Sequence, residues 1–136
     1  MIEYSDSVEG ITAGHLPGFF VGWPNPPSPE MHLRILQRAA HVVIAQDSET
    51  KRVVGFVNAL SDGVLSAYIP LLEVLPEYQT KGIGTELVRR MMAILGDLYM
   101  IDLLCDPPRE SFYSRAGLRS AFAMARRDFD HQSGLG

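Results

Sequence analysis

Hydrophobic runs of strand length recur along the chain and are separated by polar or glycine-containing segments. Residues 41–47 and 53–60 are rich in valine and isoleucine and are joined by a polar link containing SETK, which predicts a β-hairpin. Residues 66–75 form a third run, but Pro70 has no N–H for a β-ladder, so a bulge or irregular pairing is predicted there. Further strands are predicted at 2–4, 99–106 and 121–129.

Apolar residues return at helical spacing after the glycines at 82 and 84, which predicts an amphipathic helix. Its buried face consists of Ile83, Leu87, Val88, Met91, Met92 and Leu95. The arginines at 89–90 fall mostly on the opposite face, and Gly96 is a helix stop.

Three other helices are expected. A helix over about 29–40 is predicted because Ser28 is a good N-cap and a proline follows it at the first helical position. The pair Asp106–Pro107 predicts another helix start by the same rule. A short helix is also expected at 16–21.

The predicted order of elements is β, α, α, β, β, β, α, β, α, β, which indicates a mixed α/β fold. An antiparallel meander is expected in the middle and a βαβ crossover at the end. The length of 136 residues suits one domain, residues 1–136, and 46% hydrophobic with 21% charged residues is typical of a soluble globular protein.

Charge and cysteine content narrow the function classes. The net charge of −4 gives no electrostatic reason to expect nucleic acid. The single cysteine, Cys105, excludes an intrachain disulfide, and the four histidines lack metal-ligand spacing, so no metal is expected. No apolar run is long enough to span a membrane and the start of the chain does not resemble a signal peptide, so a cytoplasmic protein is expected.

The stretch PEYQTKGIGTELVRRMM, residues 76–92, joins a strand, a glycine turn and a helix N-terminus. Such a turn favours phosphate, because exposed N–H groups and the helix dipole attract an anion. Two nucleotide-binding motifs fail here. The P-loop motif GxxxxGK[ST] is absent, since Thr85 and not lysine follows Gly84, and the dinucleotide motif GxGxxG has Leu87 in place of its third glycine.

Residues 79–84, QTKGIG, match the signature Q/R-x-x-G-x-G/A. Together with the preceding LEVLPEY, the strand YMIDLLCD and the later FYSRAGLR, they resemble the GCN5-related N-acetyltransferase (GNAT) superfamily over about residues 53–129. The resemblance implies a GNAT-like acyl-CoA N-acyltransferase fold. Its central, mostly antiparallel mixed sheet would have six or seven strands and be flanked by about four helices.

The resemblance also implies that acetyl-CoA is the acyl donor and that its pyrophosphate lies on the glycine turn. It assigns cofactor contacts along the strand, at the turn and at the next strand end, to Leu72, Val74, Leu75, Gln79, Thr80, Lys81, Gly82, Ile83, Gly84, Thr85 and Asp106. Many members have glycine where this chain has Thr80, and an asparagine where it has Asp106.

Transfer to an amine needs a base for the amine and an acid for the departing thiolate. The resemblance points to Tyr113, in SFYSRAGL, as the acid, with a packed aromatic residue as the alternative. Glu73 is the best-placed base, with a solvated carboxylate as the alternative. An acyl-enzyme at Cys105 is disfavoured, because direct transfer is the family rule.

The acceptor is expected to be a primary amine of a small molecule or a protein, and the net negative charge favours a cationic one. Phe19, Phe20 and Trp23 are expected either to line its pocket or to belong to the core. A membrane partner is not expected, and a homodimer is possible because homodimers are common in the family. The alternative function is a catalytically silent acyl-CoA-binding module of the same fold.

Overall fold

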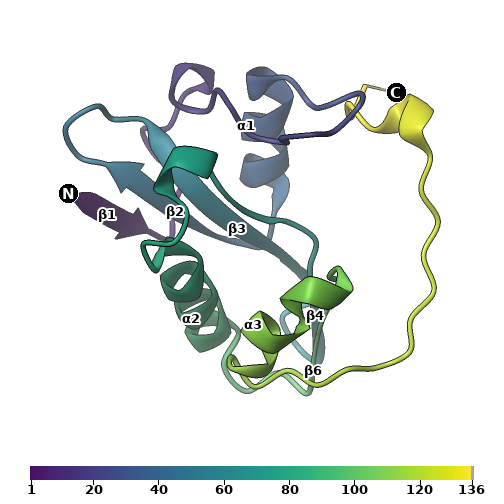
Figure 1. Cartoon of the computed structure of the whole chain (residues 1–136). Helices are drawn as coiled ribbons and strands as arrows, with labels where there is room; N and C mark the ends of the chain where they lie inside the picture. Colours follow the sequence, from purple (N-terminus) through teal and green to yellow (C-terminus); the bar gives the residue numbers. More distant parts are fainter. Residues whose placement is uncertain (136) are drawn as a thin grey trace.

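The computed structural model describes residues 1–135, which form a six-stranded sheet in the spatial order β1-β2-β3-β4-β6, with β5 also paired to β3 (Figure 1). The pairing is antiparallel except between β4 and β6, which are parallel. The strands are β1 Ile2–Ser5, β2 His41–Asp47, β3 Val53–Ser61, β4 Ser66–Ile69, β5 Leu72–Val74 and β6 Met100–Leu103. The predicted hairpin, β2 with β3, and the predicted crossover from β4 through a helix to β6 are both confirmed.

Within residues 1–135, three α-helices accompany the sheet: α1 Pro29–Arg38, α2 Ile83–Leu95 and α3 Glu110–Ser114. Single 3-10 turns lie at η1 Ala13–His15, η2 Pro76–Tyr78, η3 Pro107–Arg109 and η4 Phe129–His131. As predicted, Ser28 caps α1 by accepting the N–H of Met31 on its hydroxyl at 3.1 Å, and α2 begins after Gly82 and ends at Gly96.

The expected helix at 16–21 is wrong, so the structure has three α-helices in its described part where about four were expected. Gly18 and Phe20 both have left-handed backbone angles, with φ of 97° and 63°. A helix cannot contain such residues, and Pro17 also lacks the N–H that a helix interior would need. The segment instead folds as turns, with Phe20 buried beneath it.

The central strands β2 and β3 are buried on both faces, which explains their continuous apolar runs. On β2, Val43 and Ala45 join the cluster beneath α2, whereas Val42 and Ile44 join the cluster beneath α1 and residues 16–20. The two helices therefore cover opposite faces of the sheet, as Figure 1 shows.

The apolar run 66–75 forms two strands instead of one, which confirms the irregular pairing predicted at Pro70. The β4 segment pairs with the end of β3 and with β6, whereas β5 pairs with β3 at residues 55–57. Buried Asn58 bridges the break: its Oδ1 accepts the N–H of Leu71 at 3.1 Å and its own N–H donates to the Leu71 carbonyl at 3.2 Å. The parallel pairing ends at Ile69 and Leu103, so β5 continues without β6 beside it.

The strand predicted at 121–129 is wrong. Residues 118–128 have no helix or strand, and within residues 1–135 nothing pairs with them. We name residues 119–128 the C-terminal arm. In Figure 1 the arm leaves α3, passes β6 and returns to the loop before α1, where the Asn25 N–H donates to Gln132 Oε1 at 2.8 Å. The alternating apolar pattern has strand propensity, but a strand also needs a neighbour, and this chain path supplies none.

Among the described residues, no helix is both long and apolar enough to cross a membrane.

Candidate active site

An open cleft of about 910 Å³ lies where β5 and β6 diverge. One wall is β5 with η2, the glycine turn and the start of α2, and the opposite wall is residues 103–106 with α3. The third side is formed by Val21, Trp23 and Arg127. The cleft therefore collects the strand, the turn and the α3 segment that the sequence singled out.

The edge of β5 that faces away from β3 is uncovered. Because β3 pairs with β5 on one side and β6 stops at Leu103, no strand within residues 1–135 covers the other side. Uncovered N–H and C=O groups of a strand are ready to pair with an extended ligand. One is already used: the Val74 carbonyl accepts Gln79 Nε2 at 3.0 Å, which ties the turn to β5.

The turn presents six successive backbone N–H groups, those of residues 80–85, that have no acceptor in the described part of the chain. The first intrahelical bond at this end of α2 runs from the Glu86 N–H to the Gly82 carbonyl at 3.1 Å. Unpaired N–H groups at a helix start, together with the helix dipole, make an anion site. This arrangement matches the turn geometry that the sequence predicted.

Glycine is needed in this turn at one position and leaves room at another. Gly82 has φ of 83°, where an L residue would be strained, although a Cβ there would meet nothing within 4 Å. A Cβ on Gly84 would lie 3.7 Å from Phe112 Cζ and project into the space between α2 and α3. Thr80 also has a left-handed backbone, with φ of 65°, a conformation that glycine adopts without strain and threonine does not.

The structure brings most of the predicted site residues to the cleft, but not all of them. The cleft is lined by Leu72, Glu73, Val74, Gln79, Thr80, Gly82, Ile83, Gly84, Thr85, Asp106 and Tyr113. Leu75 and Lys81 are not in the lining: Leu75 is fully buried and its N–H donates to the Val54 carbonyl, and Lys81 Nζ lies 5.4 Å from the Tyr78 ring centre.

Tyr113 reaches the cleft from α3 and is half-buried beside the exposed Cys105. Burial raises the pKa of the Tyr113 hydroxyl above its usual value of 10.0, and the neighbouring Cys105 raises it further, against an opposing effect of Arg109. Its hydroxyl has no hydrogen-bond partner in residues 1–135. A protonated, unpartnered hydroxyl at the cleft is available to donate a proton.

Glu73 joins β5 to the loop before α1. Its Oε1 accepts the N–H of Phe20 at 2.8 Å, and its Oε2 accepts the N–H of Val21 at 3.2 Å. The carboxylate therefore has a positioning role that the sequence did not reveal. Each carboxylate oxygen keeps a further lone pair that can accept a proton donor from the cleft side.

The aromatic residues before α1 divide between core and cleft. Phe19 and Phe20 pack against the buried His32 and Phe56, and Trp23 is part of the cleft wall. The sequence alone does not decide between the core and the pocket lining for these three aromatic residues.

Asp106 stands at the N-cap position of η3, but its side chain accepts no capping hydrogen bond, so its carboxylate is free at the cleft. Phe112 and Arg127 also line the cleft, although Arg127 lies in the segment that was predicted to be a strand. No local signal marks Arg127, because the arm brings it to the cleft from a distance in sequence.

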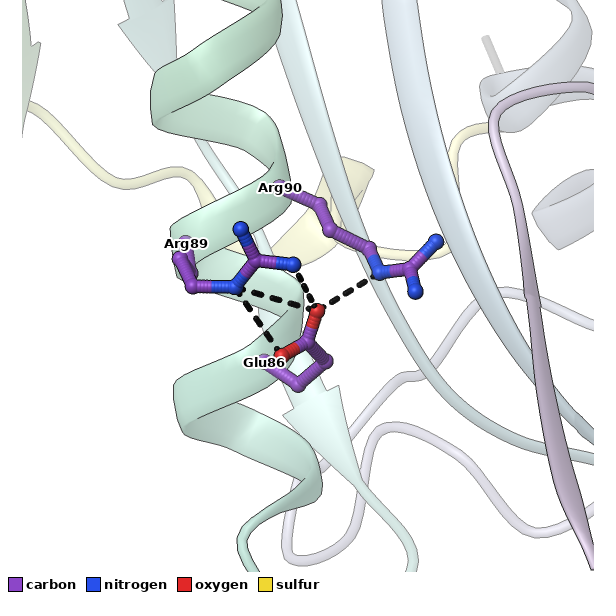
Figure 2. A network of polar contacts seen from close by, with 3 residues as sticks. All are labelled: Glu86, Arg89 and Arg90. Carbon is purple, nitrogen blue, oxygen red and sulfur yellow. Dashed lines mark hydrogen bonds and ion pairs between the residues drawn. The ribbon is translucent and has the colours of Figure 1, made fainter.

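The charged residues Glu86, Arg89 and Arg90 of α2 pair with one another. Figure 2 shows Glu86 between Arg89, whose Nε lies 3.0 Å from Glu86 Oε1, and Arg90, whose Nε lies 2.7 Å from Oε2. Hydrogen bonds from both arginines lower the pKa of Glu86 to about 2. Arg90 also covers the Tyr4 ring at 4.6 Å, so these arginines belong to the outer surface, as the sequence predicted.

No group of three or more metal-ligating side chains occurs among residues 1–135.

Comparison with known proteins decides the family. The family model "Acetyltransferase (GNAT) family" matches residues 8–118, which include both main walls of the cleft. The chain belongs to the GNAT acetyltransferase family. No curated protein matches the sequence. The match ends at Leu118, so the C-terminal arm of this GNAT member lies outside the family model.

Solved structures share the fold of this GNAT member. A crystal structure of a "putative acetyltransferase" from Deinococcus radiodurans R1 is 52% identical, covers 99% of this chain and 94% of its own, and has a TM-score of 0.95. A GNAT family acetyltransferase from Streptococcus pneumoniae TIGR4 is 24% identical. The match covers 94% of this chain and 100% of that chain, with a TM-score of 0.68. Glucosamine-6-phosphate N-acetyltransferase from Arabidopsis thaliana is 11% identical. The match covers 96% of this chain and 99% of that chain, with a TM-score of 0.71.

Proposed function

We propose that the protein is an acetyl-CoA-dependent N-acetyltransferase that transfers the acetyl group to a primary amine by direct attack. The observation that carries the proposal is the run of six unpaired N–H groups at residues 80–85, placed beside the uncovered edge of β5. The six groups suit the pyrophosphate, and the strand edge suits the amide groups of the pantetheine arm. Bound there, acetyl-CoA supplies the activated acyl group.

Tyr113 supports a role as the acid. Tyr113 lines the cleft on the wall formed by α3 and the residues after β6, and its raised pKa keeps its hydroxyl protonated at neutral pH. It donates its proton to the sulfur of the departing coenzyme. A backbone N–H on the uncovered edge of β5 donates to the acyl oxygen, where negative charge develops.

Glu73 is proposed as the base. Its two N–H partners leave lone pairs that accept the amine proton through a water. Glu73 and Asp106 place two carboxylates on the cleft wall, and Arg109 and Arg127 place two guanidinium groups there, so the charges of the lining balance and do not select the charge of the acceptor. Trp23 and Val21 offer an apolar surface for the rest of the acceptor.

The same contacts of Glu73 favour one alternative, a binding module that holds acyl-CoA without turnover. If the two N–H groups fully engage the carboxylate, no base remains in the cleft. Ligand binding and turnover therefore need separate measurements.

The test compares thermal shifts with acetyl-CoA, coenzyme A, ATP and NAD, followed by release of the coenzyme thiol with a panel of primary amines. A ligand at 100 times its Kd stabilises the native state by about 2.7 kcal/mol, which raises the Tm of a domain of this size by roughly 10 °C. A shift with both coenzymes and amine-dependent thiol release support the proposal. A shift without turnover supports the binding module, and a larger shift with ATP or NAD contradicts both.

A further inference from the structure

Arg52, the last residue before β3, contacts two segments that contribute to the cleft, although its own side chain is not part of the lining. Its Nη1 lies 2.8 Å from Oε1 of Glu77, in η2. A Cβ on Gly18 would lie only 2.9 Å from Arg52 Nη2, so the same guanidinium packs directly against the backbone of residue 18. One side chain therefore joins two segments that are far apart in the sequence.

The two segments serve different parts of the cleft. Residues 76–85, which we name the coenzyme turn, comprise η2 and the six free N–H groups that follow it. Residues 16–23, which we name the acceptor loop, carry Val21 and Trp23 into the lining. Both names rest on the proposed function. The contacts of Arg52 thus run from the phosphate side of the cleft to the acceptor side.

The backbone of Arg52 is a firm base for this link. The Asp47 N–H donates to the Arg52 carbonyl at 2.9 Å, and the N–H of Arg52 donates to Thr50 Oγ1 at 3.3 Å. These bonds close the link between β2 and β3. The Tyr78 hydroxyl donates to Asp47 Oδ2 at 3.1 Å, which ties the coenzyme turn to the same hairpin end. A displacement of the coenzyme turn relative to this hairpin end therefore strains these contacts.

The guanidinium of Arg52 is only partly used. Its Nε is buried without a hydrogen-bond partner, and within residues 1–135 its Nη2 has no acceptor either. The pair with Glu77 is half-exposed, with 37% of the Arg52 side chain and 52% of the Glu77 side chain accessible. Such pairs hold weakly, because fixing two long side chains costs conformational entropy. The strength of this contact therefore depends on how firmly Glu77 is held.

A ligand on the coenzyme turn changes that condition. An anion bound to the N–H groups of residues 80–85 restricts the turn, and the adjoining Glu77 is restricted with it. Part of the entropy cost of the pair with Arg52 is then already met, so the guanidinium is held more firmly against Gly18. The acceptor loop is also anchored by Glu73, which accepts the N–H groups of Phe20 and Val21. Arg52 supplies the anchor on the other side of Phe20.

We propose that Arg52 is a positioning residue that links the coenzyme turn to the acceptor loop through Glu77 and Gly18. Ligand on the turn fixes the loop that shapes the acceptor side of the cleft. The link passes outside the cleft, because neither Arg52 nor residues 16–20 belong to its lining. Residues 18–20 should therefore respond to a ligand that they do not touch.

The test is hydrogen exchange at residues 18–20, measured with and without saturating coenzyme A, whose binding is followed separately by calorimetry. We expect coenzyme A to slow this exchange in the natural protein. The effect of coenzyme A should be lost in Arg52→Met, which keeps an unbranched side chain without the charge, and in Glu77→Gln, which leaves Arg52 in place. Arg89→Met removes another ion-paired arginine, on α2, and is the control that should keep the effect.

The readout is the difference between the free and the bound protein. A merely structural role of Arg52 would change exchange equally in both states and leave this difference intact. The proposal is overturned if coenzyme A binds without slowing exchange at 18–20 in the natural protein, or if the slowing persists in either Arg52→Met or Glu77→Gln. Both results leave the proposed function standing. Absence of coenzyme A binding to the natural protein contradicts the proposed function and overturns this inference with it.

Discussion

Glu73 on β5 accepts the backbone N–H of Phe20 at 2.8 Å, across 53 residues of sequence. Phe20 has a left-handed backbone, which costs roughly 1–3 kcal/mol for a residue other than glycine. The contact therefore holds a strained loop against the strand that forms the cleft wall. One carboxylate serves both to shape the acceptor side and, in the proposed reaction, to take up a proton.

Substitution of Glu73 separates these two roles. Glu73→Gln keeps an oxygen for the Phe20 N–H but removes the base and places an amide NH₂ against the Val21 N–H, so we expect kcat to fall by about 10²-fold or more with only a small fall in Tm. Glu73→Ala removes both, and we expect a further loss of about 1–3 kcal/mol in the free energy of unfolding. Steady-state kinetics and thermal melts measure the two effects. Normal kcat in Glu73→Gln would leave Glu73 with a positioning role alone.

Tyr113→Phe removes the proposed acid without removing a protein hydrogen bond. We expect kcat to fall by about 10²-fold or more, whereas the Kd for acetyl-CoA and the Tm stay close to those of the natural protein. The exposed Tyr99→Phe is the matched control. The required form is the protonated one and burial raises its pKa, so the alkaline fall in the natural enzyme's kcat should lie above pH 10.0. An unchanged kcat in Tyr113→Phe would exclude this acid.

Two glycines with nearly the same backbone allow a controlled test of the turn. Gly82 and Gly63 have φ of 83° and 74°, and a Cβ at either meets nothing within 4 Å. Alanine at either position should lower stability by about 1 kcal/mol through backbone strain. Only Gly82→Ala should also weaken coenzyme A binding, because it moves N–H groups of the anion site. Calorimetric titration with coenzyme A measures the Kd of the two variants. If Gly82→Ala and Gly63→Ala bind coenzyme A equally well, the turn is not the phosphate site.

His32 predicts a pH-dependent loss of stability. It is fully buried among Phe19, Phe20 and Phe56, and this burial lowers its pKa from 6.5 to about 4. The unfolded chain binds the proton more tightly, so stability is complete above pH 6.5 and falls as the pH drops toward 4. The full loss is about 3 kcal/mol. Urea unfolding across this range measures it, and His32→Leu should flatten the curve. An equally steep curve in that variant would assign the effect to other groups.

Asn58 keeps the break between β4 and β5 in place. Asn58→Leu should cost about 1–3 kcal/mol, because the N–H of Leu71 loses its acceptor in a partly buried position. Acetyl-CoA affinity should fall too, since the edge of β5 is no longer fixed relative to β6. Asn25→Ala, at an exposed asparagine, is the control for stability. If affinity is retained at reduced stability, Asn58 supports the fold alone and not the cleft.

The sequence predicted best where the determining interactions are local. The turn at residues 79–84 follows from glycine and helix-start chemistry within one short segment, and the structure places its free N–H groups as expected. Pro70 likewise revealed the strand break through its missing N–H. The helix expected at 16–21 is absent partly for local reasons, Pro17 and the left-handed Gly18, and the distant carboxylate of Glu73 also accepts the N–H of Phe20 in its non-helical conformation.

The C-terminal arm shows where prediction from the sequence fails, because its position depends on distant contacts. Alternating apolar residues indicate that a segment is suited to a strand, but they carry no information on which edge is free to receive it. The place of Arg127 at the cleft depends on that path and on the anchoring of Asn25 against Gln132, 107 residues apart. Contacts of this range need the assembled fold.

The parallel pairing of Ser66 with Met100 also has a kinetic consequence. The β2–β3 hairpin joins neighbours in sequence, whereas β6 reaches β4 only after the whole of α2 has been placed between them. Closing so long a segment loses more chain entropy than closing a hairpin, so we expect β6 to dock late in folding. Since the divergence of β5 from β6 creates the cleft, the molecule would acquire its binding site in one of its last folding steps.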